Sequence, residues 1–116
     1  MLQLNKIQLT GRVGAIRTQQ VQDGTLAGIR LAVSERYTRR DGQKVEDTIW
    51  LNVTATGSAG NFAAQYIGKG DLIFVEGRLR ERTWTGRDGE EHKELEILAR
   101  DVQSIEKKKE GDDLPL

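Results

Sequence analysis

The stretch from Leu72 to Trp84, LIFVEGRLRERTW, separates into two alternating sets of positions. Odd positions from 73 to 79 carry small or apolar residues, whereas even positions from 78 onward carry Arg78, Arg80, Arg82 and Trp84. Successive side chains of a β-strand point to opposite faces of the sheet. The stretch therefore predicts a strand with one face in a core and the other lined by three guanidinium groups and an indole.

The same alternation predicts four further strands, separated by Asp-Gly turns at residues 23–24, 41–42 and 88–89. Tyr37 shares the inward parity of the second strand, so its side chain points inward unless a bulge between Ser34 and Tyr37 switches the face. Whether the last strand extends through Val102 and Ile105 is left open by the pattern. The inward-facing positions predicted by the alternation are Ile7, Leu9, Gly11 and Val13; Ile29, Leu31 and Val33; Ile49, Leu51, Val53 and Ala55; Ile73, Val75, Gly77 and Leu79; and Leu95, Ile97 and Ala99.

Between Ser58 and Lys69 the spacing of apolar residues changes to that of a helix. Apolar side chains recur at intervals of three and four residues, which places them on one stripe. We expect Ser58 to cap this helix and the glycines at 68 and 70 to end it. The stripe would place Phe62 and Tyr66 in the core.

The predicted order is three strands, one helix and two strands. This order predicts an all-β fold, the five-stranded Greek-key barrel called the OB-fold, with one helix between strands 3 and 4. An SH3-like barrel is the competing architecture, but it leaves the helix unexplained. We expect the domain to span residues 1–106 and a short charged tail, predicted to be disordered, to span residues 107–116.

Composition narrows the classes of function. The chain of 116 residues has 18 basic and 18 acidic residues, so binding of a polyanion would depend on local clusters of charge. No apolar run approaches the roughly 20 residues that a membrane-spanning helix needs, and the N-terminus resembles neither a signal peptide nor a transit peptide. There is no cysteine, which excludes disulfides and thiolate metal sites and fits a reducing cytosol.

Residues that would indicate catalysis are sparse. His92 is the only histidine, and it lies beside Glu90 and Glu91, whereas a metal site needs more ligands. Glu94 and Glu96 share one face of the last strand and are interpreted as its solvated side. No P-loop and no nucleophile-elbow serine is present. We therefore expect no enzymatic activity, no metal and no cofactor.

Two tryptophans lie on polar faces. Trp50 has the polar parity of the third strand, as Trp84 has that of the fourth. Arginine pairs with phosphate and stacks on planar rings, and aromatics interleaved with arginine suit a groove that follows a nucleic-acid backbone and stacks its bases. The alternatives are a solvated face whose charges protect a strand edge, and indoles that only cover a neighbour.

Six blocks of the chain resemble, in order, bacterial single-stranded-DNA-binding proteins. The two most specific blocks are residues 75–80 and residues 82–85, the latter followed by Asp88-Gly89. The remaining blocks are residues 5–7 with 10–14, residues 31–37, residues 48–50 and residues 66–70. The resemblance implies an OB-fold homotetramer, with a dimer less favoured, in the cytoplasm with the nucleoid. Such a protein binds single-stranded DNA largely without sequence preference and protects it during replication, recombination and repair.

The resemblance also assigns roles to individual residues. Trp50, Trp84 and Tyr37 would stack on bases. The chain has Thr56 where many relatives have another aromatic, and Leu51 where a histidine often helps the subunit contact. The cations expected to meet phosphates are Lys6, Arg12, Arg39, Arg40, Arg78, Arg80, Arg82 and Arg87.

The C-terminus resembles the acidic tip through which the family docks replication, recombination and repair proteins. This tip ends in Leu rather than Phe, and the usual Gly- and Gln-rich linker is almost absent. Its residues are Asp112, Asp113, Leu114, Pro115 and Leu116. Other readings keep the fold and change the function: a protein-interaction module of a replication-restart (primosomal) accessory protein, or an RNA-binding protein. An acid-cluster nuclease is the enzymatic alternative.

Overall fold

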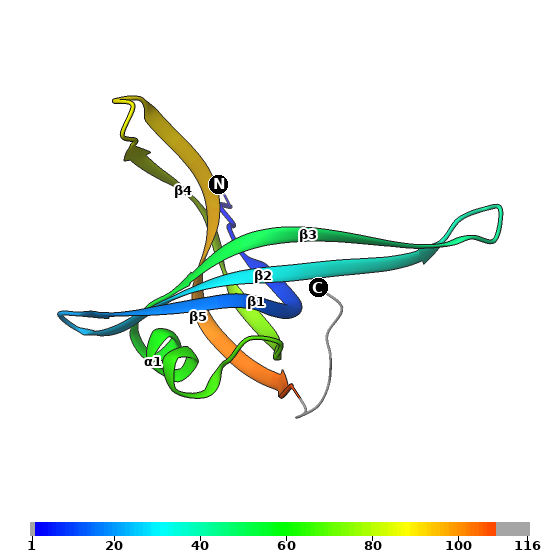
Figure 1. Cartoon of the computed structure of the whole chain (residues 1–116), viewed down its shortest axis with the longest axis horizontal. Coiled ribbons are helices and arrows are strands. Elements are labelled where there is room, and N and C mark those ends of the chain that lie inside the picture. Colours follow the sequence, from blue (N-terminus) through cyan, green and yellow to red (C-terminus); the bar gives the residue numbers. More distant parts are fainter. Residues whose placement is uncertain (1, 109–116) are drawn as a thin grey trace.

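Five strands and one helix make up the part of the chain that the structure describes, residues 2–108 of a computed structural model. The strands close into a barrel in the order β1-β2-β3-β5-β4 (Figure 1). All neighbouring pairs are antiparallel except β3 and β5, which are parallel. The predicted OB-fold barrel is confirmed. Its elements are β1 (Ile7–Val21), β2 (Gly24–Thr38), β3 (Lys44–Ala55), α1 (Gly57–Tyr66), β4 (Leu72–Thr85) and β5 (Glu91–Glu106).

The core fills the barrel with the side chains that the alternation placed inward. Strand β5 keeps both Ala99 and Val102 buried although their parity differs. The pairing of β4 with β5 shifts by one residue between Glu76 and Gly77, so Arg100 is an extra residue that switches the inward face. The largest fully buried side chains are Val13, Leu31, Val53, Ile73, Val75 and Ile97.

Two hairpins extend beyond the barrel as arms, β2–β3 in one direction and β4–β5 in another (Figure 1). Apolar and polar residues still alternate along these arms. There, however, the side chains that would point into the barrel are exposed to solvent. The prediction that Ile49, Leu79 and Leu95 lie inside is therefore wrong, since all three are exposed.

Tyr37 lies on the β2–β3 arm. The register of β2 and β3 runs without a shift from Ala27 to Thr38, so no bulge separates Ser34 from Tyr37. Tyr37 keeps the parity of Leu31 and is nevertheless 49% exposed, because it lies past the end of the barrel. The expectation that it points into the core is wrong for the same reason as at the three apolar positions of the arms.

Helix α1 packs against the barrel through Ala59 and Ala63, which are buried. The helix is shorter than predicted, beginning at Gly57 and ending at Tyr66, and the residue at its N-cap is Thr56 rather than Ser58. Phe62 packs partly buried against the core, but Tyr66 is 52% exposed and was wrongly placed there. It lies at the last turn of the helix, where its ring contacts that of Phe62 with centroids 5.1 Å apart.

A buried carboxylate holds the end of the described chain. Asp71 is 3% exposed and accepts hydrogen bonds from the backbone N–H groups of Gly68 (2.9 Å) and Lys108 (3.0 Å). The Lys107 ammonium lies 3.0 Å from the same carboxylate. Burial alone would raise the pKa of the Asp71 carboxyl, but these donors and the ammonium together lower it. The chain therefore leaves the barrel from a fixed point beside Asp71.

Candidate nucleic-acid interface

Trp50 lies on the outer face of β3, where a glycine makes room for it. A Cβ at Gly14 would come within 2.4 Å of Trp50 Cζ3, so the indole packs against β1 only because that residue has no side chain. The Arg30 guanidinium carbon lies 5.9 Å from the centroid of the indole. Trp50 remains 44% exposed, and a planar ligand can therefore reach it.

Trp84 lies on the β4–β5 arm between two planar side chains. It pairs across the hairpin with His92, whose ring is stacked on the indole with centroids 5.4 Å apart and an interplanar angle of 24°. The Arg82 guanidinium carbon lies 5.0 Å from the indole centroid. Trp84 is 37% exposed. The arm thus holds the indole in place while leaving part of it accessible.

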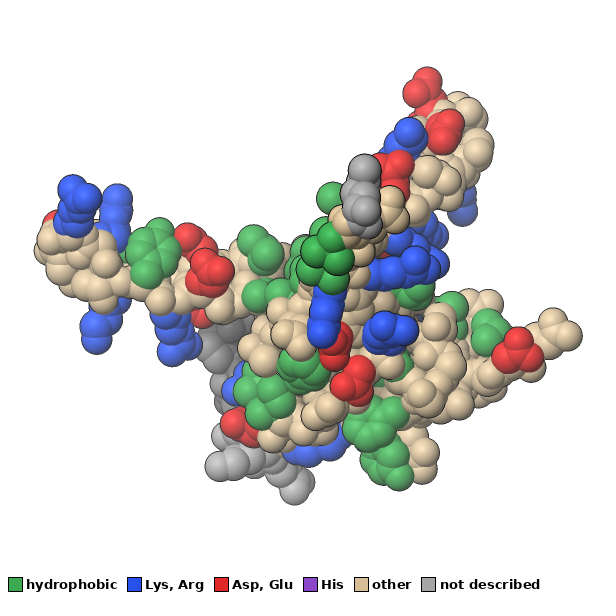
Figure 2. All heavy atoms as spheres, turned by 180° about the vertical axis from the view of Figure 1, so that it is seen from behind, with side chains coloured by type: hydrophobic (Ala, Val, Ile, Leu, Met, Phe, Trp, Pro, Cys, Tyr) green, Lys and Arg blue, Asp and Glu red, His purple; other side chains and the backbone are tan. Residues whose placement is uncertain are grey.

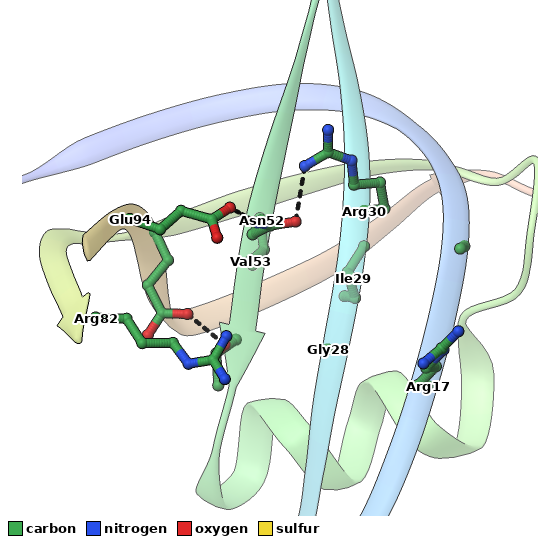
Figure 3. A pocket seen from close by; sticks show the side chains of 11 residues that line it. Arg17, Gly28, Ile29, Arg30, Asn52, Val53, Arg82 and Glu94 are labelled. Carbon is green, nitrogen blue, oxygen red and sulfur yellow. Dashed lines mark hydrogen bonds between the residues drawn. The ribbon is translucent and has the colours of Figure 1, made fainter. Parts of the chain in front are cut away.

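A groove of about 480 Å³ runs between the β1–β2–β3 face and the β4–β5 arm (Figure 3). Trp50 and Trp84 lie beside its wall, each two residues along its strand, on the same face, from a residue of the wall, Asn52 and Arg82. Trp50 also lines a second cavity of about 740 Å³ together with Gly14. We refer to the surface of the groove and these two indoles as the groove face. It comprises Arg17, Arg30, Trp50, Asn52, Arg82, Trp84 and Glu94.

Two of these cations were absent from the sequence prediction. Arg30 alternates with the buried Ile29 and Leu31, so its parity could have placed it beside Trp50. Arg17 could not be placed in this way, because the register of β1 shifts between Val13 and Ala15. Only the shift brings Arg17 onto the outer face next to the groove.

The carboxylate of Glu96 is buried, not solvated as its alternation suggested. Glu96 is 6% exposed, and its Oε1 lies 2.7 Å from both Nε and Nη2 of Arg80. Its Oε2 accepts a hydrogen bond from the Thr54 hydroxyl at 3.1 Å. The fork of Arg80 is therefore occupied within the fold, in contrast to the exposed Arg78 and Arg82 on the same strand.

The remaining predicted contacts are spread over other surfaces. Tyr37 lies on the opposite face of the β2–β3 arm from Trp50, and its hydroxyl donates to Asp47 at 3.2 Å. This hydrogen bond and the charge of Asp47 raise the pKa of Tyr37. Lys and Arg side chains, among them Arg39 and Arg40, gather at the tip of this arm (Figure 2).

Four more predicted cations lie close to carboxylates or away from the groove. The Lys6 ammonium is 2.9 Å from Glu76, and Arg12 Nη2 is 3.5 Å from Glu106. Arg78 lines a separate cavity of about 720 Å³ together with Lys6. Arg87 is exposed in the turn between β4 and β5. The predicted tail site, residues 112–116, lies outside the described residues.

Residues 4–105 match the sequence profile described as the Single-strand binding protein family. The chain belongs to this family. It is 35% identical over 114 residues to Single-stranded DNA-binding protein 1 of Xylella fastidiosa (strain 9a5c), covering 96% of this chain and 84% of that protein. It is 34% identical over 106 residues to the Single-stranded DNA-binding protein of Neisseria meningitidis serogroup A (strain DSM 15465 / Z2491), covering 90% of this chain but 61% of that protein.

Solved structures of the family share the fold. The Plasmodium falciparum SSB complex with ssDNA gives a TM-score of 0.76 at 25% identity and covers 91% of this chain and 98% of that one. The single-stranded DNA binding protein from Thermus aquaticus, a deletion mutant, gives 0.73 at 30% identity, covering 89% of this chain and 51% of that one. The likeness therefore extends across the barrel and both arms.

Among residues 2–108, no group of three or more His, Asp or Glu side chains is arranged to hold a metal ion. No helix in the same range is long and apolar enough to cross a membrane.

Proposed function

We propose that the chain binds single-stranded DNA along the groove face, largely without sequence preference. The observation that carries this proposal is the pair of exposed indoles beside one groove, each with a guanidinium group within 6 Å of its ring centroid. Bases of any sequence present a π-face to such indoles, and Arg17, Arg30 and Arg82 supply positive charge for the backbone. The family membership and the ssDNA complex of the Plasmodium relative support the same ligand. Protection of DNA strands in replication, recombination and repair, in the cytoplasm with the nucleoid, follows from this activity.

The salt dependence of binding tests which cations meet phosphates. Each phosphate neutralised on a single strand adds about 0.7 to the slope of log K against log salt concentration. We expect Arg82→Ala to reduce that slope for oligo-dT by about 0.7. Lys93→Ala is the matched control, because Lys93 lies on the same arm with the opposite parity and so faces away from the groove. Equal slopes in both variants would remove Arg82 from the phosphate contacts.

We also propose that the chain self-associates, with four copies favoured over two. Support comes from apolar side chains on the arms that the barrel leaves uncovered, Leu79, Leu95 and Ile49. Light scattering should then give a mass of two or four chains of 13.0 kDa each. A monomer at micromolar concentration would rule self-association out.

The acidic C-terminal tip is proposed to dock replication and repair proteins. Its sequence, with Asp112, Asp113 and an apolar end, suits a peptide whose carboxylate enters a basic pocket and whose last side chain enters an apolar one. Deleting residues 111–116 should abolish capture of such partners and leave DNA affinity equal or slightly higher at low salt. Retention of every partner by the shortened chain would refute the proposal.

A further inference from the structure

Glu94 and Glu96 are the two carboxylates in the wall of a groove that is also lined by arginines. Glu94 lies on β5 opposite Arg82 of β4, half-buried, with its side chain in the groove wall (Figure 3). Its Oε1 accepts a hydrogen bond from Asn52 Nδ2, and Asn52 Oδ1 accepts one from Arg30 Nη1 at 2.8 Å. The carboxylate is therefore oriented by Asn52, which Arg30 orients in turn.

The carboxylate of Glu94 has no structural partner of the kind that Glu96 has. Arg80 neutralises Glu96, whereas no ion pair joins Glu94 to any residue between 2 and 108. The guanidinium of Arg82, its cross-strand neighbour, lies over Trp84 instead. A negative charge beside the path of a polyanion weakens binding by repulsion, unless the ligand donates a hydrogen bond to it.

Bases differ in their ability to donate to a carboxylate, which can only accept. Cytosine N4, adenine N6 and guanine N2 are exocyclic amines that donate hydrogen bonds, and Glu or Asp accepts from cytosine N4. Thymine has no exocyclic amine, and its N3–H lies between two carbonyl oxygens that repel a carboxylate. With bases held near the indoles, Glu94 is placed to meet a base edge rather than a phosphate.

We propose that Glu94 is a specificity-determining residue, which accepts a hydrogen bond from the exocyclic amine of a base. The contact shifts the preference of the groove away from thymine and toward the three bases that carry an exocyclic amine, cytosine, adenine and guanine, on top of stacking that tolerates every base. The proposal rests on the proposed function, because it assumes that single-stranded DNA enters the groove.

The test compares oligo-dC with oligo-dT of the same length at one salt concentration, in the wild-type chain and in Glu94→Gln. The glutamine keeps the shape and an oxygen for Asn52, but it loses the charge and gains a donor for thymine O4. The ratio of the Kd for oligo-dT to the Kd for oligo-dC should fall by about fivefold in the variant, the lower end of what one base-edge contact provides. Because the ratio is measured within each protein, a general change in affinity cancels.

Glu91→Gln is the matched control. Glu91 lies on the same arm with the opposite parity, so its replacement changes the net charge equally without touching the groove face, and the ratio should stay at its wild-type value. If Glu94→Gln tightens binding of both oligonucleotides equally, Glu94 acts through charge alone, and this inference fails while the proposed function stands. If the wild-type chain binds neither oligonucleotide, the proposed function itself fails.

Discussion

Replacing Trp50 and Trp84 together by alanine is expected to weaken oligo-dT binding by about 2 to 6 kcal/mol, since each stacked base contributes about 1 to 3 kcal/mol. Each single variant should show about half of this loss. The loss should be additive, because the indoles lie beside the groove on different strands and share no contact partner. Fluorescence anisotropy with a labelled oligonucleotide gives the affinities.

Two controls make the tryptophan result specific. Tyr66→Ala removes an exposed aromatic from α1, away from the groove, and should leave oligo-dT affinity unchanged. Thermal unfolding of the Trp84→Ala chain should stay close to that of the wild type, because Trp84 lies on an arm outside the core. Unfolding of both single variants together with intact DNA binding in Tyr66→Ala would mean that the indoles are structural.

The second large effect concerns Arg80, which should matter for stability more than for DNA. Arg80→Ala leaves the buried carboxylate of Glu96 without its counter-charge. Removing one partner of a buried pair costs about 3 to 5 kcal/mol, and the partial exposure of the Arg80 side chain brings the expected loss in the free energy of unfolding to about 2 to 3 kcal/mol. Urea denaturation measures this loss.

Arg78→Ala is the control for Arg80, because it removes an exposed guanidinium from the same strand and should change stability by less than about 0.5 kcal/mol. The double variant Arg80→Met with Glu96→Leu should recover most of the stability that Arg80→Ala loses, since no unpaired charge remains buried. A stable Arg80→Ala chain with a shallower salt slope would instead make Arg80 a phosphate ligand.

Alternation was enough to predict the barrel, because one parity of each strand is buried wherever the strand belongs to the closed sheet. It also placed Trp50, Arg82 and Trp84 outside correctly. The alternation failed at Leu79 and Leu95. It tells which residues of a strand lie on the same face, but it does not tell where a hairpin extends beyond the barrel.

The side-chain contacts at the site could not be predicted from the sequence, because they depend on how the strands pair. The pairing of Arg80 with Glu96 depends on the register of β4 against β5, which the sequence does not state. The same holds for Glu94, which looked like a solvated residue until β3 placed Asn52 against it. Tyr37 was expected to stack on bases together with the tryptophans. Trp50 pairs with Ala32, and Tyr37 lies an odd number of residues from Ala32 along β2, so its side chain lies on the other face.

The proposed function requires that the indoles of the groove face contact single-stranded DNA. Titration of the purified wild-type chain with oligo-dT, followed by intrinsic tryptophan fluorescence, tests it most directly, because Trp50 and Trp84 are the only tryptophans of the chain. We expect saturable quenching that is reduced in each single variant and reversed by added salt. Unchanged fluorescence at a DNA concentration where anisotropy shows full binding would contradict this expectation, and would place the DNA on another surface.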